Sequence, residues 1–315
     1  MDSFHVYERS LMLDGVLFFP VTPFAPDGGP QLEALEAHVR AGVSAGAGAV
    51  FAACGTGEFH ALSAGEHTDV VRTAVGAANG TVPVYAGVGG ALPAAVALAG
   101  AARDNGADGL LLLPPYLVNA DQAGLVEYVR QIAAATELPV IVYNRANARF
   151  GPGAAVEVAA IDTVTGFKDG VGDIETLART VVAIRQSLRA SGKAFQFFNG
   201  LPTAEATVPA YRAIGVPLYS SAVFCFAPEI SLAFHRAVTT GDDKLVDALE
   251  AGFFHPLVAL RDKVPGYAVS LVKAGVRLRG LDVGPVRPPL TEPAPDDLRE
   301  LAALLECGLD LVKGV

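Results

Sequence analysis

Short, continuous apolar runs alternate with longer stretches of mixed polarity from near the N-terminus to about residue 240. The runs are too short to be helices, and uninterrupted apolar character is typical of parallel strands that are buried on both faces. The expected strands are Val16–Phe19, Ala49–Ala53, Val84–Ala86, Gly109–Leu113, Val140–Tyr143, Val164–Lys168, Phe195–Phe198 and Val216–Ser220. The stretches between them, such as Gln31–Ala45, Pro93–Asn105 and Gln122–Thr136, are rich in Ala and Leu and have helical length. Repeated strand–helix units of this number predict an α/β fold, a closed (β/α)8 TIM barrel.

The strand pattern stops after residue 240. Three helical patterns follow, at Asp243–Leu260, Tyr267–Leu278 and Pro295–Val312. We therefore expect a barrel that carries the active site over residues 1–240. Residues 241–315 are expected to form a C-terminal helical appendage packed on that barrel.

Composition excludes several classes of partner. The net charge of −10 argues against nucleic acid, which requires a basic face. The most apolar segment, Leu110–Val118, contains two prolines and is too short to span a membrane. The segment Met1–His5 has no basic flank followed by an apolar stretch, so we expect no signal peptide and a cytoplasmic protein.

The cysteines and histidines do not predict a metal site. The three cysteines are far apart, which argues against both a disulfide framework and a zinc cluster. Cys54 is expected to be a small buried residue. The histidines lack ligand spacing and are expected to be structural or surface residues: His5, His38, His60, His67, His235 and His255.

The main candidates for catalysis are Lys168 and Tyr143, which end two successive expected strands. Burial penalises an ammonium ion, so a lysine at such a position can lose its proton and attack a carbonyl carbon. The neighbouring tyrosine can then transfer a proton. The pair suggests Schiff-base chemistry on a keto acid. The alternatives are a lysine that ends a strand in a surface ion pair, and a tyrosine that packs in the barrel mouth.

A second candidate is the turn Gly55-Thr56-Gly57 after the second expected strand. Its glycines allow close approach of a ligand, and successive N–H groups at a helix N-terminus suit an anion such as a carboxylate. An ordinary tight turn with a capping threonine is equally compatible with this segment. It does not match a dinucleotide fingerprint, because the third spaced glycine is missing.

Further polar residues follow the later strands, at Asn199-Gly200 and Ser220-Ser221. In a barrel of this kind the active site lies at the C-terminal ends of the strands, so these residues are expected on the same rim. Asn199 can equally be a turn residue before Gly200.

Taken together, these motifs resemble the dihydrodipicolinate synthase and N-acetylneuraminate lyase family of Schiff-base (β/α)8 lyases. The resemblance covers nearly the whole chain and rests on five ordered motifs. They are Phe19-Pro20-Val21-Thr22-Pro23-Phe24, Gly55-Thr56-Gly57-Glu58, Tyr143-Asn144, Gly166-Phe167-Lys168-Asp169 and the segment Leu281–Leu290. The resemblance implies that Lys168 forms the Schiff base, that Tyr143 transfers protons and that Thr56 and the Gly57 amide bind a carboxylate. It also implies a homo-oligomer, a dimer or a tetramer.

Three departures separate this chain from the synthase members of that family. Gly55 replaces the first of two adjacent hydroxyl residues, Leu117 replaces a second tyrosine, and Ala148 stands where an arginine follows the catalytic tyrosine. The remaining pattern is similar to the 5-dehydro-4-deoxyglucarate dehydratase branch, which releases water and carbon dioxide to give 2,5-dioxopentanoate. The resemblance therefore implies a keto-deoxy sugar diacid as substrate.

This chemistry requires no metal, thiamine or pyridoxal, because a protonated imine is itself the electron sink. Three other functions remain open, one of them a phosphate-binding barrel that uses a nucleotide or flavin, for which the loops after the last two expected strands offer only a weak phosphate site. A class I aldolase acting on 2-keto-3-deoxy sugar acids uses the same lysine, and a non-catalytic sugar-acid-binding barrel keeps the same fold.

A diacid has a second, distal carboxylate that must also be bound. We expect neutral donors at Asn147, Asn199 and Ser221 to hold it, because tight ion pairing opposes the loss of carbon dioxide. The rival candidate is Arg145, two residues after Tyr143.

Overall fold

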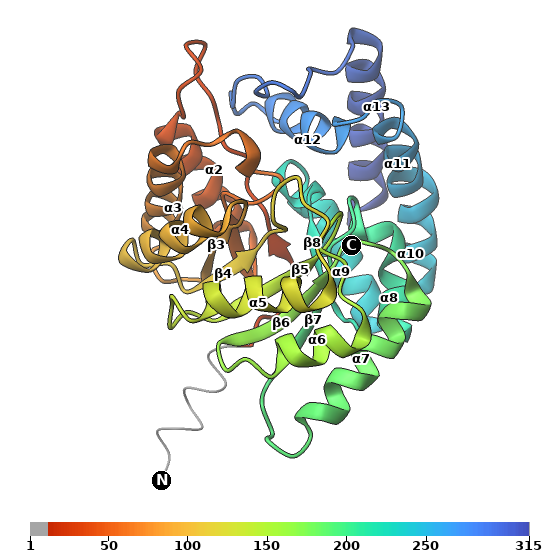
Figure 1. The fold of residues 1–315 in the computed structure, drawn as a ribbon. Coiled ribbons are helices and arrows are strands. Elements are labelled where there is room, and N and C mark those ends of the chain that lie inside the picture. The colour runs from red at the N-terminus through yellow and green to blue at the C-terminus, as the bar shows by residue number, and fades with distance from the viewer. Residues whose placement is uncertain (1–11, 315) are drawn as a thin grey trace.

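Eight parallel strands form a closed barrel in the computed structural model, which describes residues 12–314 (Figure 1). The segment Met1–His5, considered above for a signal peptide, lies outside the described residues. The strands are β1 Leu17–Phe18, β2 Ala49–Ala52, β3 Val84–Val88, β4 Gly109–Leu112, β5 Val140–Asn144, β6 Val164–Asp169, β7 Gln196–Asn199 and β8 Leu218–Ser221. Each strand pairs with the next along the chain, and β1 pairs with β8 to close the barrel. The (β/α)8 fold expected from the sequence is confirmed.

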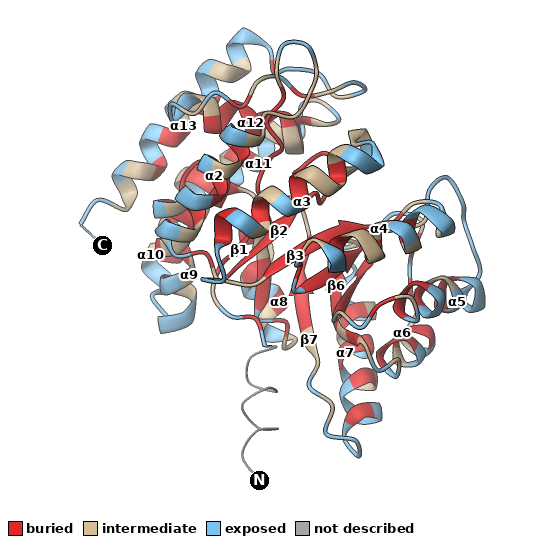
Figure 2. Cartoon of the chain, turned by 90° about the vertical axis from the view of Figure 1, so that its left-hand side faces the viewer, coloured by how far each residue is buried: buried red, intermediate tan, exposed pale blue. Residues whose placement is uncertain are grey.

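Helices surround the barrel, and each buries the side that faces the strands (red) while its outer side is exposed (pale blue) (Figure 2). They are α2 Leu32–Ala45, α3 Ala64–Ala78, α4 Leu92–Asp104, α5 Gln122–Ala133, α6 Pro152–Ala159, α7 Ile174–Leu188, α8 Val208–Ala213 and α9 Pro228–Thr240. Three short 3-10 segments lie in the loops, at η1 Phe59–Ala61, η2 Ala204–Thr207 and η3 Val223–Cys225. No helix within residues 12–314 is long and apolar enough to cross a membrane.

Five further helical segments follow the barrel. They are α10 Asp243–Leu249, η4 Glu250–Phe254, α11 His255–Arg261, α12 Tyr267–Leu278 and α13 Pro295–Leu311. The helix expected over residues 243–260 is therefore interrupted by η4, a π-helical turn. Phe253 and Phe254 in this turn are both fully buried, and the Phe254 ring packs 4.9 Å from Phe234 of α9. This contact joins the C-terminal helices to the barrel.

Side chains along each strand alternate between the barrel interior and the layer beneath the helices. The interior is filled by an apolar cluster that includes Leu17, Leu111 and Phe198. Phe51 stacks between Phe19 and Tyr85, at centroid distances of 4.5 and 5.0 Å. The interior is thus filled, and the large cavity lies at the mouth of the barrel.

Candidate active site

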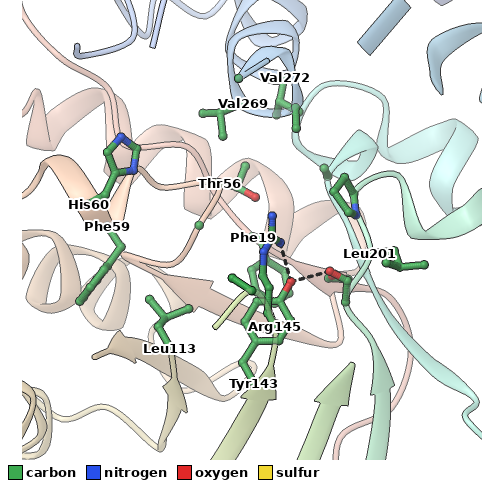
Figure 3. Close-up of a pocket in the computed structure, with 18 of the residues that line it drawn as sticks. Phe19, Thr56, Phe59, His60, Leu113, Tyr143, Arg145, Leu201, Val269 and Val272 are labelled. Atoms are coloured by element: carbon green, nitrogen blue, oxygen red, sulfur yellow. Dashed lines mark hydrogen bonds between the residues drawn. The ribbon is translucent and has the colours of Figure 1, made fainter. Parts of the chain in front are cut away.

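A cavity of about 620 Å³ opens at the C-terminal ends of the strands. Its floor and sides come from the strand ends and the loops that follow them, and Val269 and Val272 of α12 face it from the opposite side (Figure 3). Leu257 and Arg261 of α11 also line it. Residues beyond 240 therefore help to form the site that we expected within residues 1–240. The division of the chain at residue 240 stays a prediction.

Lys168 and Tyr143 lie side by side at the bottom of this cavity. They are register partners on β6 and β5, so both side chains point into the barrel. The Lys168 side chain is buried, and its Nζ lies 4.2 Å from the centre of the Tyr143 ring. On the other side, Nζ lies 4.3 Å from the centre of the Phe19 ring. The amine is thus held between two aromatic rings.

Burial lowers the pKa of Lys168 from its ordinary value, because the ammonium ion loses its hydration. Tyr143 and Cys54 oppose this shift, and the positive charge of Arg145 adds to it. Within residues 12–314, no carboxylate forms a salt bridge with Lys168. The surroundings therefore favour the neutral amine, which is the nucleophilic form.

The phenol of Tyr143 is fixed by two hydrogen bonds. Its O–H donates to the carbonyl oxygen of Gly200 over 2.5 Å, and its oxygen accepts from Arg145 Nη1 over 2.8 Å (Figure 3). Gly200 is required by this packing. A Cβ atom there would lie 2.7 Å from Tyr143 Cε2 and 2.8 Å from Lys168 Cε. A larger residue would displace one of the two side chains.

The turn Gly55-Thr56-Gly57 forms another part of the cavity wall. Gly55 and Thr56 line the cavity, while Gly57 lies behind them and accepts a hydrogen bond from Thr22 Oγ1 over 2.7 Å. In the described part of the chain, the amides of Thr56 and Gly57 donate to no other group. At the cavity wall the turn thus provides Thr56, with an unbonded amide and a hydroxyl group, which suit a carboxylate.

The turn is anchored from behind by Glu58, which has a left-handed backbone with φ of 57°. Glu58 Oε1 lies 2.7 Å from Nζ of Lys273 on α12, and Glu58 Oε2 accepts from the amide of Arg287 over 2.8 Å. Lys273 Nζ also donates to the carbonyl oxygen of Pro285 over 2.7 Å. The C-terminal segment therefore holds the turn in position.

Asn199 and Ser221 do not reach the cavity, which corrects our expectation for their position. Phe198 and Ser220 point inward, so alternation along the strands turns the next residues toward the helices. Asn199 is fully buried and its Nδ2 donates to Ala204 O over 3.2 Å and Thr207 Oγ1 over 2.8 Å. Ser221 is also fully buried, with its Oγ 2.5 Å from Glu205 Oε1. Both side chains order the loops behind the site.

Asn147 does line the cavity, but its donors are already engaged. Its Nδ2 donates to the carbonyl oxygens of Pro115, over 2.8 Å, and of Val118. These bonds connect the loop after β4 to the loop after β5. Since only its amide oxygen remains, Asn147 offers an acceptor where a carboxylate needs a donor.

Several cavity residues were not predicted from the sequence. They are the Phe19 ring beside Lys168, the Gly200 carbonyl group, the α12 residues and His60, which we expected to be structural or on the surface. Side chains alternate along a strand, so if Phe198 points into the barrel beside Lys168, the next residue, Asn199, must point away from the cavity. This alternation could have excluded Asn199 as a cavity residue. No comparable local signal marks the contribution of α12.

The described residues offer no evident metal site. Among residues 12–314, no three His, Cys, Asp or Glu side chains cluster closely enough to hold a metal ion. The cavity instead combines a buried amine, a phenol and a turn with free N–H groups. Such an arrangement can form an imine with a keto acid and move protons around it.

Comparison with known proteins shows the family to which the chain belongs. A model of the dihydrodipicolinate synthetase family matches residues 12–307. A Streptomyces coelicolor protein named "Probable 5-dehydro-4-deoxyglucarate dehydratase 1" is 56% identical over 313 residues, which is 99% of this chain and 98% of that protein. A Variovorax paradoxus protein named "Probable 5-dehydro-4-deoxyglucarate dehydratase" is 44% identical, over 95% of this chain and 96% of that one.

The solved structures give the same picture at lower identity. Dihydrodipicolinate synthase from Oceanobacillus iheyensis superposes with a TM-score of 0.87 at 25% identity, and the match covers 96% of this chain and 98% of that one. The family model spans both the barrel and most of the C-terminal helices, as does this structural match. The family resemblance inferred from the motifs is thus confirmed, and the chain belongs to the dihydrodipicolinate synthetase family.

Proposed function

We propose that this protein is a decarboxylating 5-dehydro-4-deoxyglucarate dehydratase that acts through a Schiff base on Lys168. The observation that carries the proposal is the pairing of Lys168 and Tyr143 at the bottom of the cavity, with Nζ 4.2 Å from the phenol ring. The relatives that bear this enzyme name cover nearly the whole chain and supply the substrate class. The substrate is a keto-deoxy sugar diacid, and the products are 2,5-dioxopentanoate, water and carbon dioxide.

The first step is attack of the neutral Lys168 amine on the keto carbon of the substrate, here numbered C2. Water leaves and a protonated imine forms, which makes the C3 protons acidic. The phenol of Tyr143 lies beside the amine and is the group we assign to proton transfer. Loss of one C3 proton gives an enamine.

The enamine then expels the C4 hydroxyl group, which leaves as water after protonation. The product is an iminium ion conjugated through C3 and C4. When the C5–C6 bond breaks, its electron pair moves through this conjugated system to the imine nitrogen, and C6 leaves as carbon dioxide. Protonation and hydrolysis of the imine release the keto aldehyde and restore Lys168. The imine is the electron sink for both eliminations, so one lysine serves the whole sequence.

We assign the carboxylate next to C2 to the turn Gly55-Thr56-Gly57. Its backbone N–H groups are already in place, so binding does not require side chains to become ordered. We also expect a cytoplasmic homo-oligomer, either a dimer or a tetramer, a state that light scattering of the purified protein measures.

The test is reductive trapping followed by product analysis. Borohydride added with the diacid should inactivate the enzyme and add the mass of the reduced ligand to the peptide that contains Lys168. Lys168→Ala should lower turnover by several orders of magnitude. Label on Lys193, Lys263 or Lys273 would contradict the assignment of the lysine.

Product analysis separates this function from its alternatives. Release of carbon dioxide from the diacid supports the dehydratase. Release of pyruvate identifies an aldolase that uses the same lysine. Binding with neither imine formation nor turnover identifies a sugar-acid-binding protein.

A further inference from the structure

We infer that Arg145 binds the distal carboxylate of the substrate and thereby selects diacids over monoacids. This inference rests on the proposed function, because it concerns the second carboxylate of that substrate. It reverses our expectation that neutral donors hold this group. Four features of the cavity lead to it.

The first feature is the charge of the cavity. Two cationic side chains, Arg145 and Arg261, line it together with His60 and the Lys168 amine, and no Asp or Glu of the described chain does so. This is unusual in a protein with a net charge of −10. A cavity lined by one sign of charge concentrates ligands of the opposite sign, so this one favours an anion with more than one charge.

The second feature is that Arg145, unlike Arg261, has unused binding capacity. Lys168 is assigned to the imine. Arg261 is neutralised by Asp262, with Nε 2.8 Å from Oδ1, and its Nη1 donates to the carbonyl oxygen of Pro202 over 2.6 Å. Within residues 12–314, Arg145 has no carboxylate partner, and its side chain makes one hydrogen bond, to the Tyr143 phenol. A guanidinium group has five N–H donors in a planar fork, so enough remain to bind a carboxylate at two points.

The third feature is that the loop holds Arg145 in place. Its amide donates to Ala148 O over 3.1 Å, and the Ala148 amide donates back to Arg145 O over 2.9 Å. Ala146 between them has a left-handed backbone with φ of 52°. Arg145 and Thr56 enter the same space as Tyr143 from different loops (Figure 3). The two anion-binding groups thus flank the catalytic pair.

The fourth feature is that the neutral candidates are unavailable. Asn199 and Ser221 are buried behind the strands, and both N–H groups of Asn147 are directed to carbonyl oxygens. Arg145 is more exposed than they are, so solvent screens its attraction for the carboxylate. A screened ion pair positions the group without strongly opposing its loss as carbon dioxide.

The test compares two substrates in three proteins. The substrates are the diacid and the matching 2-keto-3-deoxy monoacid, which has a CH2OH group in place of the distal carboxylate. The proteins are the wild type, Arg145→Met and Arg149→Met. Arg149 is a matched control, because it is an exposed cation of the same loop that does not line the cavity. The readouts are kcat and KM for dehydration and the rate of borohydride trapping with each substrate.

Arg145→Met is expected to lower kcat/KM for the diacid roughly 10- to 100-fold, mainly through KM, because a charge-assisted hydrogen bond is lost. Trapping of the monoacid should change less than about threefold, and Arg149→Met should leave the ratio of the two substrates unchanged. Arg145→Lys, which keeps the charge and loses the fork, should restore part of the preference. Circular dichroism checks that each variant is folded.

Equal losses with both substrates would overturn the inference, because Arg145 would then act through Tyr143. Unchanged discrimination in Arg145→Met, or equal losses in Arg149→Met, would overturn it as well. If Arg145→Met does not fold, Arg145→Lys is the deciding variant. If Arg145→Lys prefers the diacid over the monoacid as strongly as the wild type does, the planar fork of Arg145 has no role in that preference. Failure of the proposed function has a different signature, since the wild type itself would then release no carbon dioxide from the diacid.

Discussion

Glu58 and Lys273 form an ion pair that is closed to solvent, although 215 residues separate them in the sequence. Glu58 directly follows the turn Gly55-Thr56-Gly57, to which we assign the keto-acid carboxylate, and Lys273 lies on α12, several of whose residues line the cavity. Burial lowers the pKa of Lys273, and the charge of Glu58 opposes that shift. The pair therefore connects the C-terminal helices to the active site. Because both charges are buried, loss of either partner would leave the other charge uncompensated.

Lys273→Met should destabilise the protein by about 3–5 kcal/mol, because it leaves the Glu58 carboxylate buried without a counter-charge. Urea unfolding measures this loss. The double variant Glu58→Gln with Lys273→Met should regain a large part of it, since no unpaired charge remains. In the folded single variant Glu58→Gln, KM should rise more than kcat falls, because the turn loses its anchor.

Lys263→Met is the matched control for that experiment. Lys263 pairs with Asp297 and Glu300 at the surface, where solvent screens the charges. Its replacement should leave the unfolding midpoint nearly unchanged. Equal effects of the two substitutions would show that burial of the Glu58–Lys273 pair is not what makes it important.

Tyr143→Phe should slow turnover roughly 10²- to 10⁴-fold while the protein stays folded. The ring still packs against Lys168, but the hydroxyl group that bonds Gly200 and Arg145 is lost. Stopped assays of carbon dioxide release measure turnover, and circular dichroism measures folding. Turnover close to that of the wild type would mean that another group transfers the proton.

Gly200→Ala should lower activity by about two orders of magnitude or more, because the new Cβ atom would collide with the side chains of both Lys168 and Tyr143. Gly153→Ala in α6 is the control, since a Cβ atom there meets nothing within 4 Å. That control should retain full activity and gain a few tenths of a kcal/mol to about 1 kcal/mol of stability. An active Gly200→Ala variant would show that Tyr143 and Lys168 can move apart without loss.

Glu205→Gln should make stability less sensitive to pH between about 4.5 and 7. Burial without a counter-charge raises the pKa of Glu205 from 4.5 to about 7, so the folded protein holds a proton that the unfolded chain releases. The contribution of Glu205 is therefore complete below pH 4.5 and is lost as the pH rises through 7, a loss of about 3 kcal/mol. Glutamine does not ionise and keeps an acceptor for Ser221 Oγ.

Urea unfolding of both proteins at pH 5 and pH 8 measures this effect. The variant should gain stability relative to the wild type on going from pH 5 to pH 8. A constant difference between the two proteins would show that Glu205 ionises normally in the fold. His38, whose pKa burial lowers to about 4, titrates in both proteins and cancels in the comparison.

The order of strands and helices could be predicted from the sequence, because each element carries its own pattern. Continuous apolar runs marked all eight strands to within about two residues at each end. The Lys168–Tyr143 pair was also accessible, since two residues that end successive parallel strands must lie on one rim. These inferences use only local periodicity and chain order.

Tertiary structure decided which rim residues face the cavity and what closes it. Asn199 and Ser221 have suitable polar groups, but they occupy the alternate strand positions whose side chains point toward the helices. Which of the two sets of side chains faces the interior is decided by how the neighbouring strands pack there. Tertiary packing also accounts for the π-helical turn at Glu250–Phe254, where two adjacent phenylalanines, Phe253 and Phe254, are both buried. The Glu58–Lys273 pair and the cavity wall formed by α12 depend on contacts between distant parts of the chain. Such contacts leave no periodic pattern in either segment, because the partner of each residue lies elsewhere in the sequence.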